Sequence, residues 1–251
     1  MSDFNKADLG ALRQKLALIE RGGRGEFPAL PFGVAAIDRL LPGGGLARGA
    51  LHEVMGWAAA AEEAAEGAGF LAGILARLDP QQPVLWCQRR GDLHAPGLAR
   101  HGLSPDRLIL VHAGSEADLL YAVEEGLRCR ELAAVVGEVD ALPLGASRRL
   151  QLAAESSGVA AFALRRPHRV LPVGGEAQPT AAMTRWRITS APSRAEAGPG
   201  LGSRLWLAEL LRSRGGVPGR WLVEACDATG HVHLAQALAD RPAAERRRAY
   251  G

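Results

Sequence analysis

Short, mostly apolar runs alternate with amphipathic segments along much of the chain. The apolar runs predict buried strands, and the segments between them have the three- and four-residue apolar spacing of helices. Strands that alternate with helices indicate an α/β fold with a parallel sheet covered on both faces. The predicted strands are 51–55, 83–87, 108–112, 132–136 and 159–164, and the helices are 34–41, 69–78, 95–102, 115–129 and 147–156.

The last third of the chain has a different pattern. Residues 184–189 alternate polar and apolar positions, which predicts a half-exposed strand. Three further segments, 204–213, 220–226 and 231–234, are separated by Gly-containing turns and predict short antiparallel strands.

These patterns divide the chain into five parts. Residues 1–27 form an amphipathic N-terminal helix (8–20) and a linker, and 28–190 form the α/β core. Residues 191–203 are a linker rich in Pro, Gly, Ser and Ala, 204–236 a small basic antiparallel β appendage, and 237–251 a disordered tail.

Charge is distributed unevenly along the chain. Residues 1–125 carry 12 basic and 16 acidic side chains, a net charge of −4, whereas residues 126–251 carry 18 and 11, a net charge of +7. This asymmetry indicates a polyanionic or acidic partner for the second half.

Several classes of protein are disfavoured by composition. The sequence has no run of 18 apolar residues to cross a membrane, and its N-terminus is too polar for a signal-peptide core. The three cysteines are scattered, which is typical of inert thiols in a reducing compartment, and no spacing of His and Cys indicates a metal site. We therefore expect a cytoplasmic, nucleoid-associated protein without a metal or cofactor.

The segment LPFGVAAID (30–38), followed by GGGLARGALHEV (43–54), resembles the start of a RecA-like ATPase core. The later strands and helices follow in the order of that fold, so the resemblance covers about residues 28–190. It implies a RecA-like α/β sandwich.

The whole chain resembles more specifically the ImuA family of RecA-like proteins. The resemblance is carried by the glycine turn at 43–54, the helix SRRLQLAAESSGV (147–159), the C-terminal segment 204–230 and the final LADRPA (238–243). It implies an accessory role in damage-induced (SOS) mutagenesis. The implied partners are ImuB, an inactive Y-family-like polymerase, an error-prone DnaE-type polymerase, RecA and single-stranded DNA.

The phosphate-binding loop of RecA-like ATPases is missing from the expected place. Such a loop needs two glycines, a lysine and a hydroxyl residue to hold phosphates and Mg²⁺. Gly56 supplies the first glycine, but Ala61 replaces the second, and Glu62 and Glu63 replace the lysine and hydroxyl. No lysine follows residue 15.

The other catalytic positions that the resemblance implies are also altered. Arg90 stands where the carboxylate that activates water is expected, and Arg165 where a phosphate-sensing glutamine is expected. Glu138 lies near the metal-binding acidic position. Phosphoryl transfer requires these groups together, so we expect that the protein is not an enzyme.

Two clusters of basic and aromatic residues are candidate binding surfaces. Arginine beside an aromatic ring suits single-stranded DNA, because the guanidinium binds phosphate and the ring stacks on bases; it also suits a protein interface. For both clusters the alternative is a core position for the rings. The candidate DNA-binding residues are Arg165, Arg166, Arg169, Arg185, Trp186 and Arg187, and the candidate partner-binding residues are Arg204, Trp206, Arg212, Arg214, Arg220 and Trp221.

The sequence thus predicts a non-catalytic factor that bridges the two polymerases and RecA on DNA during translesion synthesis. Three alternatives stay open. They are an SOS-induced cell-division inhibitor with a degenerate RecA-like fold, a single-stranded DNA-binding protein with steeply salt-dependent affinity, and an ATP-binding RecA paralogue.

Overall fold

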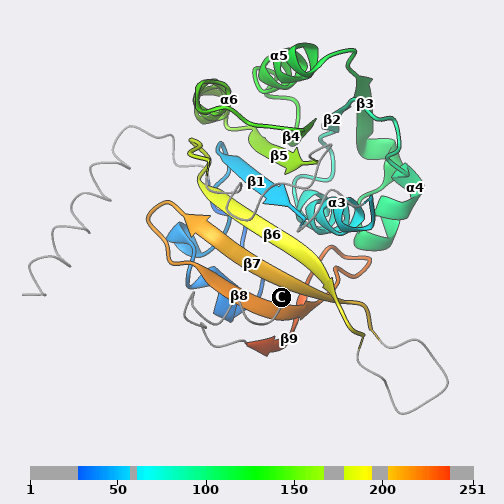
Figure 1. The fold of residues 1–251 in the computed structure, drawn as a ribbon, viewed down its shortest axis with the longest axis vertical. Coiled ribbons are helices and arrows are strands. Elements are labelled where there is room, and N and C mark those ends of the chain that lie inside the picture. The colour runs from blue at the N-terminus through cyan, green and yellow to red at the C-terminus, as the bar shows by residue number, and fades with distance from the viewer. Residues whose placement is uncertain (1–27, 57–60, 167–177, 194–202, 238–251) are drawn as a thin grey trace, which may run out of the picture.

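The structure, a computed structural model, describes residues 28–56, 61–166, 178–193 and 203–237. Its centre is a nine-stranded sheet with the order β3-β2-β4-β5-β1-β6-β7-β8-β9 (Figure 1). The strands are β1 (Leu51–Met55), β2 (Val84–Gln88), β3 (Leu108–His112), β4 (Ala134–Val139), β5 (Ala160–Arg165), β6 (Thr184–Ala191), β7 (Leu205–Ser213), β8 (Gly219–Glu224) and β9 (His233–Ala237).

The sheet has a parallel part and an antiparallel part. Every neighbouring pair from β3 to β6 is parallel, whereas β6, β7, β8 and β9 pair antiparallel. Strand β6 belongs to both parts, because it pairs in parallel with β1 and antiparallel with β7. The predicted α/β class with a mostly parallel sheet is confirmed.

Helices cover both faces of the parallel part (Figure 1). One face carries α3 (Ala61–Ala76) and α4 (Ala95–Leu98) with the 3-10 turn η2 (Ala99–His101), and the other carries α5 (Glu116–Gly126) and α6 (Leu144–Ser157). The remaining short elements are α2 (Ala35–Asp38), η1 (Pro42–Gly44) and η3 (Pro105–Arg107).

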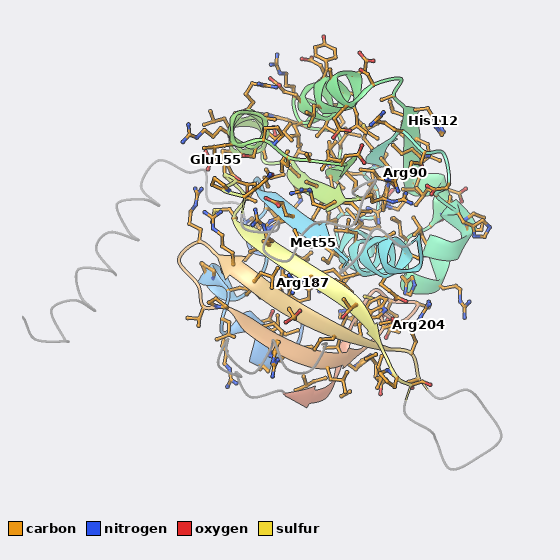
Figure 2. All side chains as sticks on the ribbon, viewed as in Figure 1. Met55, Arg90, His112, Glu155, Arg187 and Arg204 are labelled. Atoms are coloured by element: carbon orange, nitrogen blue, oxygen red, sulfur yellow. The ribbon has the colours of Figure 1, made fainter. Side chains whose placement is uncertain are left out.

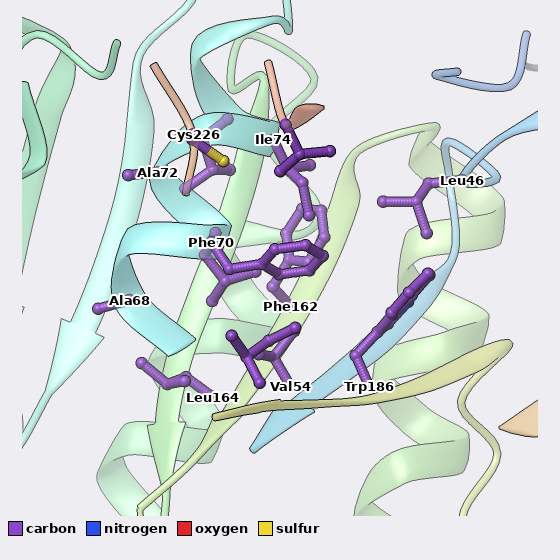
Figure 3. Close-up of a cluster of buried hydrophobic side chains, with 14 of the residues drawn as sticks. Leu46, Val54, Ala68, Phe70, Ala72, Ile74, Phe162, Leu164, Trp186 and Cys226 are labelled. Atoms are coloured by element: carbon purple, nitrogen blue, oxygen red, sulfur yellow. The ribbon is translucent and has the colours of Figure 1, made fainter. Parts of the chain in front are cut away.

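The core on the α3 face joins the two parts of the sheet. Phe70 of α3 lies 5.6 Å from the Trp186 ring of β6 and 6.3 Å from the Trp206 ring of β7, between ring centroids. Figure 3 shows Phe70 and Trp186 in this cluster, with Val54 and Phe162 of the parallel strands. Rings from both parts therefore exclude water from one continuous core.

The strands after residue 203 are therefore no separate appendage. They extend the sheet of the core, and Trp206, Trp221 and Val223 belong to the same buried cluster as Phe70. The sequence pattern predicted the strands but not their continuity with the core, because pairing between β6 and β7 is a tertiary contact.

Most of the predicted elements are found within a few residues of their expected bounds. Ser115 caps the start of α5, since its hydroxyl oxygen accepts a hydrogen bond from the Asp118 backbone N–H at 3.1 Å. Helix α3 begins at Ala61, eight residues before the predicted start at 69. The predicted helix at 8–20, residues 194–202 of the linker and residues 238–251 of the tail lie outside the described residues.

Two exposure predictions are wrong. Strand β6 was expected to be half exposed, but Thr184–Ile188 are all buried because the polar positions make buried ion pairs. Strand β3 was expected to be buried, but it is an edge strand and leaves Ile109 and Leu110 exposed at 47% and 39%.

Among the described helices, none has the length and apolar character needed to cross a bilayer. The three cysteines are free thiols. Burial raises the pKa of Cys87 and of Cys226 to about 12, so both stay protonated at neutral pH and are poor nucleophiles.

Candidate functional site

The topology creates a crevice beyond the carboxyl ends of β2 and β4. These strands are neighbours, but β2 is followed by α4 on one face and β4 by α6 on the other. In open α/β sheets ligands bind where connections leave in opposite directions in this way. The residues at this crevice therefore form the candidate functional site.

The floor of the crevice is a chain of hydrogen bonds centred on Arg166. Its guanidinium donates to both carboxylate oxygens of Asp92 at 2.7 Å and to Oε2 of Glu138 at 2.6 Å. Trp86 Nε1–H donates to Oε1 of Glu138 at 2.8 Å. Both oxygens of Glu138, the expected metal-binding carboxylate, are therefore engaged by the protein itself.

These contacts shift the pKa values of Asp92 and Arg166. The hydrogen bonds and charge of Arg166 hold the pKa of Asp92 below its usual value, so this carboxyl is ionised at neutral pH. The same pairing with Asp92, together with Glu138, raises the pKa of Arg166.

A second group of charges lies beside the first, at the ends of β2 and β4. Arg89 bridges Glu116 at 3.2 Å and Asp140 at 3.1 Å, while Arg90 contacts Asp140 at 3.4 Å and donates to the Arg166 carbonyl at 2.7 Å. Figure 2 marks Arg90 in this region. The position where a water-activating carboxylate was expected thus holds an arginine that ties two strand ends together.

The predicted phosphate-loop position is only partly described. Gly56 directly follows β1, and the backbone of Ala61, Glu62 and Glu63 forms the first turn of α3. Residues 57–60 lie outside the described residues. The sequence of this position, rather than its geometry, is what argues against a phosphate loop.

The predicted DNA-binding residues are mostly buried. Glu53 of β1, with no exposed area, pairs with Arg185 at 3.1 Å and with Arg165 at 3.6 Å. Arg187 pairs with Glu209 at 3.3 Å. These arginines tie β1, β5, β6 and β7 together.

The other predicted DNA-binding residues also fail to form an exposed surface. Trp186 lies in the core at 1% exposure, and its Nε1–H donates to Thr184 Oγ1 at 3.0 Å. Arg166 occupies the crevice floor, and Arg169 lies outside the described residues. Contact with DNA through this set stays a prediction, but its described members have the burial of structural residues.

The predicted partner-binding residues separate into two groups. Trp206 and Trp221 are core residues at 0% and 4% exposure, while Arg212 and Arg214 donate to the carbonyls of Thr180 and Ala181. Arg220 is half-buried in β8. Arg204 differs, because 63% of its side chain is exposed at the start of β7, where Figure 2 marks it.

A cavity of about 660 Å³ opens beside Arg204, between α3, the segment 92–101, the two residues before β7 and the end of β8 with the turn after it. Its floor is formed by Glu138, Leu164 and Arg166, so it is continuous with the crevice. We call it the hairpin cavity. Its one signal in the sequence is the run of small residues in α3 that supplies Ala65, Ala68 and Gly69 to its wall, and this signal did not predict a cavity.

The described residues contain no group of three or more His, Cys, Asp or Glu side chains arranged to hold a metal ion. The polar groups of the crevice pair with each other, and what stays open is a cavity with apolar and charged walls. Fold and site therefore define a doubly wound α/β protein whose crevice charges are paired within the protein.

The chain is 40% identical over 252 aligned residues to Protein ImuA from two strains of Caulobacter vibrioides, NA1000/CB15N and ATCC 19089/CB 15. Each alignment covers 93% of this chain and 100% of the relative. No protein-family model matches the chain. The chain belongs to the ImuA family.

Proposed function

We propose that this protein is a non-catalytic accessory factor of damage-induced mutagenesis. In this role it bridges ImuB, the inactive Y-family-like polymerase, to an error-prone DnaE-type polymerase and to RecA on DNA. Membership of the ImuA family is consistent with a mutagenesis factor. The partners are those that the family resemblance implies.

The observation that carries the non-catalytic part is the closed charge network of the crevice. Glu138 is held by Arg166 and Trp86, and Asp140 by Arg89 and Arg90. A carboxylate whose oxygens already accept such hydrogen bonds would have to give them up before it bound a metal. With a glutamate in place of the phosphate-loop lysine, the crevice supports binding rather than phosphoryl transfer.

Binding to the polymerase partner is tested by co-elution of the purified full-length chain with ImuB. Removal of residues 204–236 is unsuitable as a variant, because Trp206 and Trp221 belong to the core. Charge reversal at the exposed Arg204 is preferable, with reversal at the exposed Arg148 of α6, on the opposite face, as the control.

A stable complex that Arg204→Glu weakens and Arg148→Glu leaves intact would support an adaptor that binds through the surface beside β7. A complex insensitive to both would move the interface elsewhere on the protein. Absence of any complex with ImuB would reject the bridging role, and ATP hydrolysis by the purified chain would reject the non-catalytic part.

A further inference from the structure

The hairpin cavity is large enough for a ligand and is built from several parts of the chain. Its volume of about 660 Å³ falls within the range of typical ligand pockets. The space exists because α3 presents Ala65, Ala68 and Gly69 to it, whereas longer side chains would fill it. At Gly69 even a Cβ atom would lie 2.9 Å from His101 Nε2, so this wall is already close-packed.

Buried contacts hold the walls in place. Trp206 Nε1–H donates to the buried Glu66 of α3, and Arg204 pairs with the same carboxylate at 3.1 Å. On the other side the His101 ring donates from Nδ1 to the Cys226 carbonyl at 2.9 Å. The cavity is therefore preformed, which reduces the entropy lost when a ligand binds.

The charges at the cavity differ between floor and rim. On the floor, Arg166 pairs with two carboxylates, Asp92 and Glu138, so the floor keeps a net negative charge. On the rim, Arg100 is exposed and makes no ion pair with any described residue, and Arg204 reaches into solvent above Glu66. The rim therefore offers guanidinium groups to one carboxylate from a ligand.

The rest of the lining is apolar or accepts hydrogen bonds. Leu93, Leu98 and Leu164 provide an apolar surface, and the half-buried Glu224 can accept hydrogen bonds from peptide N–H groups. A ligand that fits this lining combines an apolar side chain with a single negative charge.

We propose that the hairpin cavity binds a short acidic segment of a partner protein, with one apolar side chain against the three leucines and an adjacent Asp or Glu at Arg100 and Arg204. This inference deepens the proposed function and rests on it, because it gives the adaptor a specific peptide-binding site. Carboxylate pairing with arginine is strong and geometrically specific.

Nucleic acid fits the same lining less well. Its chain of phosphates would meet the carboxylates of Asp92, Glu138 and Glu224, which repel it. Single strands also bind through exposed aromatic rings, whereas the nearby Trp206 has no exposed area. A peptide brings one carboxylate to the rim and no negative charge to the floor.

The test uses the full-length chain and a labelled synthetic peptide that carries one Leu beside one Asp among Gly and Ser residues. The same peptide with Lys in place of Asp, and a labelled single-stranded oligonucleotide, serve as comparison probes. Ala65→Leu partly fills the cavity and keeps good helix propensity, and Arg100→Glu reverses the rim charge. Arg148→Glu is the matched control, because Arg148 is an exposed arginine on α6, on the other face of the sheet.

We expect the Asp peptide to bind the wild-type chain and Arg148→Glu equally, and both cavity variants about tenfold more weakly, a change of ~1.4 kcal/mol. Equal affinity for the Asp and Lys peptides, or Asp-peptide affinity that neither cavity variant lowers, overturns the proposal. Tighter binding of the oligonucleotide, lost in both variants, reassigns the cavity to nucleic acid. Unchanged thermal unfolding midpoints would show that the variants are folded.

The outcome is separable from that of the proposed function. If ImuB binds the chain but the Asp peptide does not, the bridging role stands and the cavity proposal fails. If the peptide binds in the cavity but ImuB does not bind the chain, the acidic-segment site stands and the partner was misassigned.

Discussion

At the scale of single residues, several buried polar side chains of this protein are satisfied by parts of the chain that are distant in sequence. His52 illustrates the principle. Its Nε2–H donates to the Ala47 carbonyl at 2.8 Å, and its Nδ1 accepts from the Thr184 hydroxyl at 2.7 Å. Trp186 in turn donates to the Thr184 oxygen. The neutral imidazole of His52 makes both of these hydrogen bonds. Protonation of the ring would place a positive charge in the core, which is unfavourable.

We predict that His52 makes stability depend on pH. Burial lowers the pKa of its ring from 6.5 to about 4 in the folded chain. The unfolded chain therefore takes up a proton first as pH falls, and the free energy of unfolding should decrease by about 3 kcal/mol between pH 6.5 and pH 4. Urea denaturation across this range measures the change. His52→Leu should show a shallower decrease, and an equally steep decrease would contradict the assignment to His52.

The ion pairs of Glu53 lead to a second prediction. Glu53→Gln leaves the side chains of Arg165 and Arg185, 4% and 8% exposed, without their carboxylate. Uncompensated buried charge should lower the free energy of unfolding by about 3 kcal/mol or more. Glu125→Gln is the control, because its pair with Arg128 is exposed and should contribute less than about 1 kcal/mol. Similar losses in the two variants would show that the buried network contributes no more than a surface pair.

At the scale of elements, α3 positions both the core and the cavity. Its small residues allow the helix to approach the sheet and the turn after β8 closely. A Cβ atom on Gly73 would lie 2.2 Å from Cys226 Sγ and 2.8 Å from Cys226 Cβ. Glycine at this position therefore sets the distance between α3 and the strands that form the opposite wall of the cavity.

We predict opposite effects for two glycine-to-alanine substitutions in helices. Gly73→Ala should destabilise the protein by about 1–3 kcal/mol, because the overlap with Cys226 outweighs the gain in helix propensity. Gly145→Ala on α6, where an added Cβ meets nothing within 4 Å, should stabilise it by about 0.5–1 kcal/mol. Thermal unfolding measures both, and stabilisation by Gly73→Ala would show that α3 can move away from the turn without cost.

At the scale of the whole molecule, the parallel and antiparallel parts of the sheet depend on one core. The Trp186 and Trp221 rings lie 6.1 Å apart between centroids, and β6 pairs with a strand of each part. Neither part can open without exposing apolar surface of the other. We therefore expect a single cooperative unfolding unit across the described strands.

Trp221→Ala tests this cooperativity. The truncation should cost about 3–5 kcal/mol, because a buried indole is removed from a packed cluster. Hydrogen exchange should then accelerate in β4 and β5 as well as in β7 and β8, since all four strands share one unfolding transition. Acceleration confined to β7 and β8 would show that the C-terminal strands unfold as an independent module.

The sequence by itself determined the local elements. Short apolar runs favour strands, so the strands were predicted within a few residues of their observed bounds. The absence of lysine after residue 15 is likewise a fact of the sequence. The α/β class and the ImuA family membership also followed from local patterns and motifs.

Only the tertiary structure decided which side chains are buried and where a ligand can bind. Arg185 donates a hydrogen bond to Glu53, which lies 132 residues away in the sequence. Trp206 donates to Glu66, which lies 140 residues away. A local pattern of arginine and tryptophan does not distinguish a surface from a core, because burial depends on such distant partners. The hairpin cavity arises for the same reason, from small side chains on α3 that face strands more than a hundred positions later in the chain.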